Sequence, residues 1–205
     1  MDILFYRYGS ICEPDIIDSF RHLGFHVDED TREIYDKKLK PSECIKGLYE
    51  MINKKSGGYT VVFSINFFPS VSDVCNIIGI PYMCLVVDSP VLELFSKSLA
   101  NRCNKVFIFD RRLYEEFLPV NPEGIYHIPL ATNVRGNYQT CTQAGGALKK
   151  RFSSDISFIG SLYTEKCIYN KTVLPPKLKG YVDGLIEAQL RVFGYNFIEE
   201  CVDDE

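Results

Sequence analysis

Strand-like and helix-like segments alternate along this chain, and that alternation constrains its fold more than any other feature. Short apolar runs with strand character recur, and the stretches between them have helical spacing. Val71, Val74, Cys75 and Ile78, for example, stand at i, i+3, i+4 and i+7 on one helix face. Because strands that alternate with crossover helices form parallel sheets, the pattern predicts an α/β fold with a doubly wound, mostly parallel, Rossmann-like sheet. Its strands are expected at residues 3–6, 25–28, 60–65, 82–87, 106–109 and 125–128.

The same pattern divides the chain into parts. Residues 1–132 hold all the strands of one complete Rossmann-like domain, and residues 133–154 are rich in Gly, Thr, Gln and Asn, which is typical of a linker. Residues 155–205 begin a second domain with a strand, a glycine turn and a helix after Pro175-Pro176. One strand and one helix cannot form a core, so we expect them to dock on the first domain or to need a missing donor-side domain or partner subunit. Their apolar surface favours oligomer formation.

The loops at the carboxyl ends of the strands are where an open α/β sheet binds its ligands. With the common strand order 3-2-1-4-5-6, the first and fourth strands lie side by side and their connections leave in opposite directions. The loops Tyr8-Gly9-Ser10 and Asp88-Ser89-Pro90 then meet, and each opens a helix amino terminus that favours an anionic or hydroxyl-rich ligand. The second of these helices is expected to carry Leu92, Phe95 and Leu99.

Asp88 is the candidate catalytic residue at this edge. A sugar hydroxyl that attacks an anomeric carbon needs a base within hydrogen-bond reach, and a carboxylate can take that proton. The same Asp-Ser-Pro sequence also reads as a helix start, with Ser89 as the N-cap and Pro90 in the first helical position, and the two roles are compatible. Gly9, Ser10 and Ser89 are candidate substrate-binding residues.

Asn66 and His127 are further candidates for substrate binding. Asn66 follows the third strand, where it either hydrogen-bonds a ligand or forms a turn before Phe67-Phe68-Pro69. His127 lies inside the sixth strand, where it either takes part in binding or is a satisfied core or surface histidine. Gly9 and Gly160 serve turns, and where their backbone approaches a ligand the missing Cβ gives access.

Charge and cysteine content speak against several classes of protein. The net charge of −4 and the pI near 5.5 give no basic surface for phosphate backbones, so no nucleic-acid partner is expected. The 8 cysteines include no C-x-x-C pair and the 3 histidines have no ligand spacing to them, so we expect no metal and interpret the cysteines as reduced, buried thiols of a cytoplasmic protein. Met1 precedes a strand rather than a secretion signal, and the apolar run 77–87 is broken by Gly79 and Pro81 and too short to span a membrane.

Several ligand-binding motifs are absent from the sequence. It has no G-x-G-x-x-G after the first strand and no G-x-x-x-x-G-K-[ST], which speaks against dinucleotide and P-loop nucleotide binding. It lacks the G-x-S-x-G of an α/β-hydrolase, and its third strand ends in Ser64-Ile65-Asn66 rather than in the Asp of a receiver domain. A flavodoxin-like regulatory domain would need a serine- and threonine-rich phosphate loop after the first strand, and the sequence has none there.

Short motifs, in a fixed order, point to a family. They are Asn66-Phe67-Phe68-Pro69, then Gly79-Ile80-Pro81-Tyr82 leading to Val87-Asp88-Ser89-Pro90, then Ile128-Pro129-Leu130-Ala131-Thr132, then Ser157-Phe158-Ile159-Gly160-Ser161-Leu162-Tyr163. With Gly180-Tyr181 and Ala188-Gln189, they extend over nearly the whole chain. In that order they resemble the CgeB-like spore-maturation group of bacterial glycosyltransferases.

The resemblance implies the amino-terminal half of a GT-B architecture, in which this half holds the acceptor and a carboxyl-terminal Rossmann-like domain holds the nucleotide-sugar. Residues 157–161 would open that donor domain, so Gly160 and Ser161 would belong to the donor loop. The resemblance further implies sugar transfer without a metal or a cofactor besides the donor, an acceptor of unspecified type, and no transfer by this chain without the rest of its donor domain. The alternative is a stand-alone Rossmann-like module that binds a small ligand or a protein without catalysis.

Overall fold

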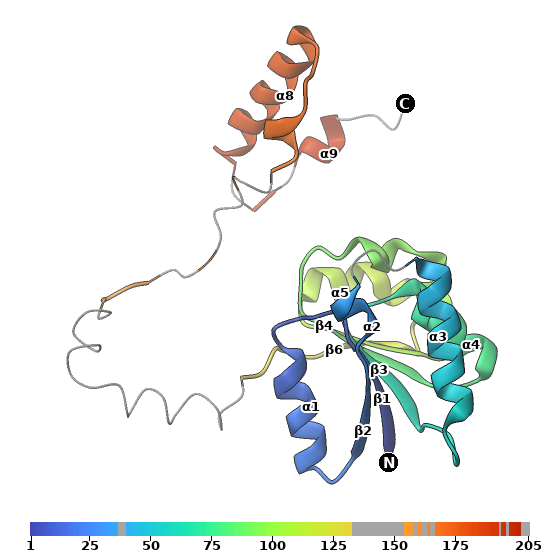
Figure 1. Cartoon of the computed structure of the whole chain (residues 1–205). Coiled ribbons are helices and arrows are strands. Elements are labelled where there is room, and N and C mark those ends of the chain that lie inside the picture. The colour runs from blue at the N-terminus through green and yellow to red at the C-terminus, as the bar shows by residue number, and fades with distance from the viewer. Residues whose placement is uncertain are drawn as a thin grey trace. The chain divides into compact units, whose positions relative to one another are not determined.

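The computed structural model describes residues 1–36, 40–132, 154–157, 160, 164, 167–192, 194, 195 and 197–201 of the 205. The chain divides into two compact units, Met1–Ala144 and Gly145–Glu205, the first with the sheet and the second with helices α8 and α9 (Figure 1). This division falls inside the segment 133–154 that is expected to be a linker, and residues 133–153 lie outside the described part of the chain.

The first unit is built on a six-stranded, all-parallel sheet with the order β2-β1-β3-β4-β5-β6. Helices flank the sheet (Figure 1), so the predicted α/β, Rossmann-like fold is confirmed. Every strand lies within two residues of its expected place. The strands are β1 (Asp2–Tyr6), β2 (His26–Asp30), β3 (Val61–Ile65), β4 (Tyr82–Val86), β5 (Asn104–Ile108) and β6 (Ile125–His127).

The predicted strand order 3-2-1-4-5-6 is wrong, because β3 and not β4 lies beside β1. Phe5 of β1 is in register with Phe63 of β3 across that junction. All residues of β3 are buried, whereas β2 has the sequence His-Val-Asp-Glu-Asp, of which only Val27 and Asp30 are buried. A strand buried on both faces belongs in the middle of a parallel sheet, and a polar strand is tolerated at its edge.

The helices of the first unit follow the predicted alternation with two exceptions, which are α2, a short helix that was not predicted, and the segment after Pro90. α1 is followed by Gly24 with a φ of +82°, and α4 by Gly79 with a φ of +79°, the left-handed conformation that favours glycine after a helix. The helices are α1 (Glu13–His22), α2 (Arg32–Tyr35), α3 (Pro41–Lys54), α4 (Pro69–Ile78) and α5 (Arg111–Phe117), and the 3₁₀ turns are η1 (Leu92–Phe95), η2 (Lys97–Ala100) and η3 (Leu118–Val120).

The single helix predicted after Pro90 is wrong, because two 3₁₀ turns, η1 and η2, stand there instead. Ser96 separates them with an extended backbone (ψ 144°), and its Oγ accepts a hydrogen bond from the backbone N–H of Ser98 at 3.2 Å. A serine side chain that binds a nearby backbone N–H in this way competes with helix continuation. Of the three apolar residues expected on this helix, Leu99 is buried, whereas Leu92 and Phe95 are exposed, and Leu94 is buried in their place. The apolar spacing therefore predicted neither the type of helix nor most of its buried face.

Two apolar clusters lie on opposite faces of the sheet, because alternate residues of a strand point to opposite sides. Leu4 and Tyr6 of β1 belong to the larger cluster, with side chains from α3, α4, η1, η2 and α5. Ile3 and Phe5 belong to the smaller cluster, and of the helices in the described part of the chain α1 alone contributes to it. The α1 face of β4 and β5 is therefore less covered, and their residues alternate between buried and half-buried.

The second unit contains η4 (Tyr169–Lys171), α8 (Pro176–Gln189) and α9 (Ile198–Cys201). α8 follows Pro175, as predicted. Residues 155–157 are not in a strand, so the strand predicted to begin there is wrong at those positions, while Phe158 and Ile159 lie outside the described residues. None of the described helices combines the length and the apolar character that a membrane span requires.

The cysteines that the structure describes are all free thiols. Cys44, Cys75 and Cys84 are buried, Cys201 is exposed, and the others are intermediate, while Cys141 lies outside the described residues. Burial raises the pKa of the Cys75 and Cys84 thiols, so both stay protonated and pack as small apolar side chains.

Asn104 ties η2 to the sheet through buried hydrogen bonds. Its Nδ2 donates to the carbonyl oxygens of Ser98 at 2.8 Å and Leu99 at 3.1 Å, and its Oδ1 accepts from Ser72 Oγ at 2.7 Å. Because Asn104→Ala leaves these groups unpaired, we expect it to lower the free energy of unfolding by about 2–4 kcal/mol in a urea titration. The control Asn53→Ala removes an exposed side chain that binds the carbonyl of Tyr49, and should cost under ~0.5 kcal/mol. Equal losses in both variants would contradict this prediction.

Candidate functional site

The connections that follow β1 and β3, two neighbouring strands, leave the sheet towards opposite faces. β1 leads into α1, which packs in the smaller cluster, and β3 leads into α4, which packs in the larger cluster on the other face. The ends of these two strands therefore form the crevice at which open α/β sheets bind ligands. Tyr8 from the first loop and Asn66 from the second meet there, with Asn66 Nδ2 3.0 Å from the Tyr8 hydroxyl oxygen.

Asn66 also connects this crevice to the end of β4. Its Nδ2 donates to Asp88 Oδ2 at 2.6 Å, and its Oδ1 accepts from the backbone N–H of Val87 at 3.0 Å. Asn66 has a φ of +57°, a conformation that asparagine tolerates better than most residues. The structure thus joins two predicted site residues, Asn66 and Asp88, whose contact with each other was not predicted. The β1–β4 contact, on which the meeting of residues 8–10 with residues 88–90 was predicted, does not exist.

A buried phenol fixes the turn that carries Asn66. The Tyr82 hydroxyl lies 2.6 Å from Ser64 Oγ and accepts from the backbone N–H of Phe68 at 3.0 Å. Ser64 Oγ in turn is 2.7 Å from the carbonyl oxygen of Asn66, to which it donates. Burial raises the pKa of Tyr82, so its hydroxyl stays neutral and both sides of the turn remain bound to it.

A pocket of about 280 Å³ opens next to Asp88 on the α1 side of the sheet. Asp88 is exposed, and in the part of the chain that the structure describes its Oδ1 has no hydrogen-bond partner. Burial raises the pKa of the Tyr8 phenol; a hydrogen bond with Ser10 lowers it, and the negative charge of Asp88 raises it further. The lining residues are Ser10, Ile11, Cys12 and Ile16 around the start of α1, Leu85, Val87 and Asp88 at the end of β4, and Leu130 and Ala131 after β6.

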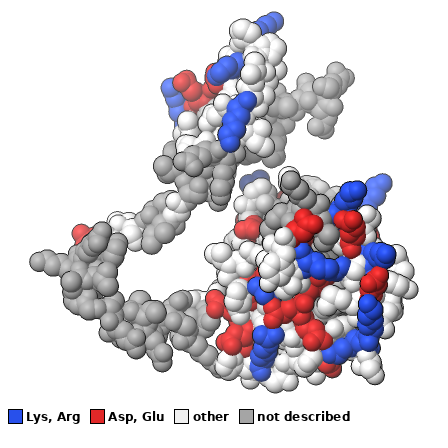
Figure 2. Space-filling view, in the orientation of Figure 1, with Lys and Arg blue, Asp and Glu red and all other residues white. Residues whose placement is uncertain are grey.

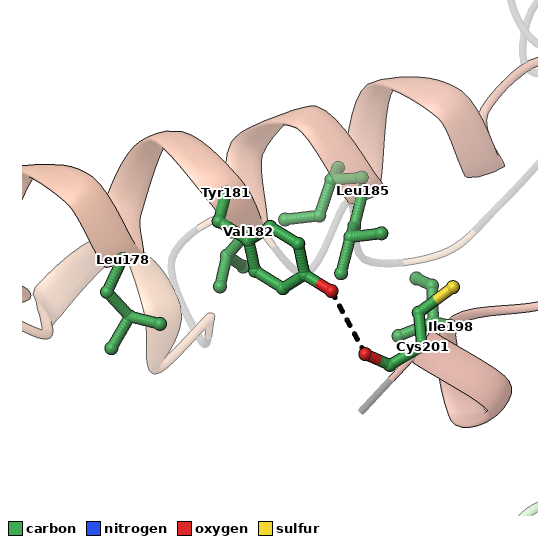
Figure 3. Close-up of a pocket in the computed structure, with 7 residues that line it drawn as sticks. Leu178, Tyr181, Val182, Leu185, Ile198 and Cys201 are labelled. Carbon is green, nitrogen blue, oxygen red and sulfur yellow. Dashed lines mark hydrogen bonds between the residues drawn. The ribbon is translucent and has the colours of Figure 1, made fainter. Parts of the chain in front are cut away.

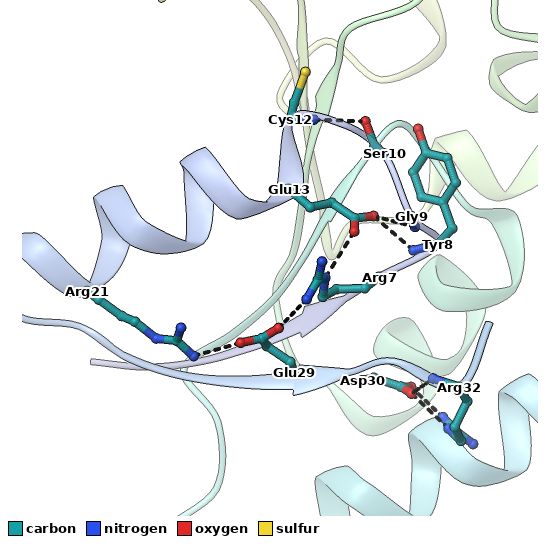
Figure 4. A network of polar contacts seen from close by, with 10 residues as sticks. All are labelled: Arg7, Tyr8, Gly9, Ser10, Cys12, Glu13, Arg21, Glu29, Asp30 and Arg32. Atoms are coloured by element: carbon teal, nitrogen blue, oxygen red, sulfur yellow. Dashed lines mark hydrogen bonds and ion pairs between the residues drawn. The ribbon is translucent and has the colours of Figure 1, made fainter. Parts of the chain in front are cut away.

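The amides of the β1–α1 loop are already bound by a carboxylate of the chain itself (Figure 4). Glu13 is fully buried, and its Oε1 accepts from the backbone N–H groups of Tyr8 at 2.9 Å and Gly9 at 3.0 Å. Its Oε2 accepts from Arg7 Nε at 3.0 Å. Gly9, with a φ of +96°, was expected to present its backbone to a ligand, and it presents its N–H to Glu13 instead.

Glu13 was not recognised as a site residue from the sequence. Two features of the sequence could have indicated its role. Glu13 is an acidic residue in the first turn of a helix, where the helix dipole favours a negative charge, and an arginine stands six residues earlier. Arg7 extends the network, because its Nη1 also contacts Glu29 Oε2 at 2.5 Å, and Arg21 Nη2 binds the other oxygen of Glu29 at 2.7 Å. Burial opposes the ionised form of Glu29, but the hydrogen bonds from Arg21 and Arg7 hold the pKa of that carboxyl below its usual range.

Ser89 is turned towards β5 rather than into the pocket. Its Oγ donates to Asp110 Oδ2 at 3.0 Å, and Asp110 Oδ1 accepts from the first N–H groups of α5. The predicted N-cap role of Ser89 is wrong, because η1 begins at Leu92 with Val91 in the cap position. Pro90 does not occupy a first helical position either, because η1 begins at Leu92.

The pocket lining contains none of the other predicted residues that the structure describes. His127 is exposed on β6, its Nε2 is 3.2 Å from the carbonyl oxygen of Phe109, and its ring centroid is 5.5 Å from that of Tyr114. Gly160 belongs to the second unit, where it is described as a bend, and Ser161 lies outside the described residues. The structure therefore assembles Ser10, Asn66 and Asp88 around one crevice and leaves Ser89 and His127 out of it.

Charged side chains do not gather into a basic patch on the face shown in Figure 2, where acidic and basic groups are interleaved. Ion pairs account for much of this arrangement, for example Lys55 with Asp28 at 2.7 Å. Among the described residues no group of His, Cys, Asp and Glu side chains has the geometry of a metal site.

A second groove, also of about 280 Å³, lies on the second unit between α8 and α9 (Figure 3). The Tyr181 hydroxyl in its lining donates to the carbonyl oxygen of Cys201 at 3.0 Å. Among the lining residues that the structure describes there is no Asp, Glu, His or Lys, so the pocket beside Asp88 is the better candidate site. Its walls include Leu178, Tyr181, Val182, Leu185, Ile198 and Cys201.

No protein-family model matches the chain, and a search of curated proteins found no match. The assignment of a function therefore depends on the geometry of the crevice and on the short motifs of the sequence.

Glu13→Gln tests the loop network directly. The amide oxygen can still accept from the N–H groups of Tyr8 and Gly9, but the NH₂ group faces the Arg7 guanidinium as donor against donor, so we expect the free energy of unfolding to fall by about 2–3 kcal/mol. Glu115→Gln is the matched control, because Glu115 forms an exposed pair with Arg111 at 2.9 Å and should cost under ~0.5 kcal/mol. A urea titration of both variants measures the difference, and a Glu13→Gln protein as stable as the control would refute the buried network.

Proposed function

We propose that the first unit is the acceptor-binding part of a GT-B glycosyltransferase, with Asp88 as the base that activates an acceptor hydroxyl. The observation that carries this proposal is the position of the Asp88 carboxylate, which lines a pocket at the carboxyl edge of the sheet and is oriented by Asn66 at 2.6 Å. The resemblance to CgeB-like glycosyltransferases supports it, because Asn66 and Asp88 lie in two of the resembling motifs.

The chemistry asked of Asp88 is one proton transfer. As the acceptor oxygen forms its bond to the anomeric carbon of the donor, the hydroxyl proton moves to Asp88 Oδ1, and the bond from that carbon to the nucleoside diphosphate breaks. Asn66 donates to Oδ2, which leaves the other oxygen to face the acceptor. Holding a base in place in this way contributes about 10²- to 10⁴-fold to a rate.

The Glu13 carboxylate that binds the amides of the β1–α1 loop supports binding of the acceptor, rather than of the nucleotide-sugar donor, by this unit. In many Rossmann-like proteins the amides of this loop bind the phosphates of a nucleotide. Here the N–H groups of Tyr8 and Gly9 are bound by the Glu13 carboxylate, so a diphosphate at the same place would meet a negative charge. We assign the donor to other residues, and Gly160 and Ser161 remain our candidates for its loop.

Asp88→Asn distinguishes a transferase from a binding module. The assay uses the first unit together with the donor-side domain that the resemblance implies, and it follows release of the nucleoside diphosphate from a panel of nucleotide-sugars. We expect the variant to reduce kcat by about 10²- to 10⁴-fold with little change in the acceptor KM. Asp18→Asn, which changes an exposed carboxylate of α1 paired with His22, should transfer at the parent rate.

Each alternative outcome has a definite meaning. If the parent protein transfers sugar and Asp88→Asn does so equally fast, Asp88 is not the base. If the parent binds small ligands in the pocket and transfers no sugar from any donor, the unit is a binding module without catalysis.

A further inference from the structure

We infer that the acceptor bound beside Asp88 is a neutral alcohol with an apolar body, held with its hydrocarbon part against α1 and β4 and its hydroxyl at the carboxylate. This inference rests on the proposed function and specifies the substrate class of the same site. It follows from the apolar side chains that line the pocket and from the small number of polar and charged groups among the described lining residues.

The wall of the pocket is hydrocarbon. Seven of the nine lining residues that the structure describes are apolar, among them Ile16 of α1, Leu85 and Val87 at the end of β4, and Leu130 after β6. Leu85 and Val87 flank the buried Val86 and therefore project to the face that α1 covers only in part. A ligand with an apolar body would remove this surface from water, which favours binding in proportion to the area covered.

The polar groups of the wall are too few for a sugar ring. Ser10 and Asp88 are the two polar side chains among the described lining residues, and Ser10 Oγ accepts a hydrogen bond from the N–H of Cys12 at 3.4 Å. The several hydroxyl groups of a sugar would lose their hydrogen bonds to water without finding partners among Ile, Leu and Val side chains, and that loss opposes binding. One hydroxyl group, placed at Asp88, is what this wall can satisfy.

Charge selects further among apolar ligands. Among the lining residues that the structure describes, Asp88 is the only Asp, Glu, Lys, Arg or His, so this described wall offers no cation to an anionic ligand. The nearby Glu13 carboxylate adds no free charge, because Arg7 and two backbone N–H groups bind it. A carboxylate ligand is repelled, and an amine would pair with Asp88 and block it as a base, so an alcohol is the substrate and an amine of the same shape is an inhibitor.

The test uses three probes in the isotope-labelled full chain, followed by amide chemical shifts. Cyclohexylmethanol has the predicted chemistry, cyclohexanecarboxylate has the same ring with a negative charge, and methyl glucoside has a polar ring. We expect the alcohol to shift the amide signals of Cys12, Ile16, Val87 and Leu130, the carboxylate to bind about tenfold more weakly or worse, and the glucoside to leave these signals unchanged.

Two variants locate the binding. Ala131→Trp places a large ring at the exposed rim of the pocket and should weaken binding of the alcohol about tenfold, and Leu130→Asp should do the same by charging the wall. Ala100→Trp is the matched control, because Ala100 is exposed at the end of η2 and outside the lining. The amide spectrum of each variant shows whether it is folded, and either pocket variant is sufficient for the test.

The inference is overturned if methyl glucoside shifts the pocket signals and the alcohol does not, or if both folded pocket variants bind the alcohol as the parent does. Failure of the proposed function looks different. In that case the alcohol binds in the pocket as expected, but Asp88→Asn transfers sugar at the parent rate, or the parent transfers none.

Discussion

The burial of every residue of β3 is the constraint on which the rest of this structure depends. A strand with no polar face has to lie between two neighbours, and β3 therefore pairs with β1 on one side and β4 on the other. This placement brings three loop ends to one edge, so that Asn66 at the end of β3 reaches Tyr8 and Asp88 with the same amide nitrogen. The candidate site follows from the order of the strands, and the order follows from burial.

The strands and most helices could be predicted from the sequence because their signals are local. Apolar runs and helical spacing depend on neighbouring residues, and glycines such as Gly79 mark where a helix ends. The strand order could have been inferred as well, since β2 carries Asp28, Glu29 and Asp30, and a strand so polar belongs at an edge. The common order 3-2-1-4-5-6 instead places β4 beside β1, whereas β3 lies there in the structure.

The features that could not be predicted depend on particular side-chain hydrogen bonds rather than on apolar spacing. The spacing of Leu92, Phe95 and Leu99 suits a helix, but Ser96 binding the N–H of Ser98 and Asn104 binding two nearby carbonyl oxygens favour two short turns. Asn66 and Asp88 were predicted as site residues because both follow strands, whereas their hydrogen bond depends on the left-handed backbone of Asn66. No local pattern indicates that Ser89 would turn to Asp110.

The Glu13 carboxylate occupies the position in the β1–α1 loop where such loops bind an anion. The loop retains the backbone geometry with which such loops bind anions, including two N–H groups directed to one point and a glycine with positive φ. A free phosphate would have to compete with a carboxylate that is tethered a few residues away and therefore present at a high effective concentration. Selectivity at this loop is thus set by an intramolecular competitor, and the loop would become available to external anions only through displacement of Glu13.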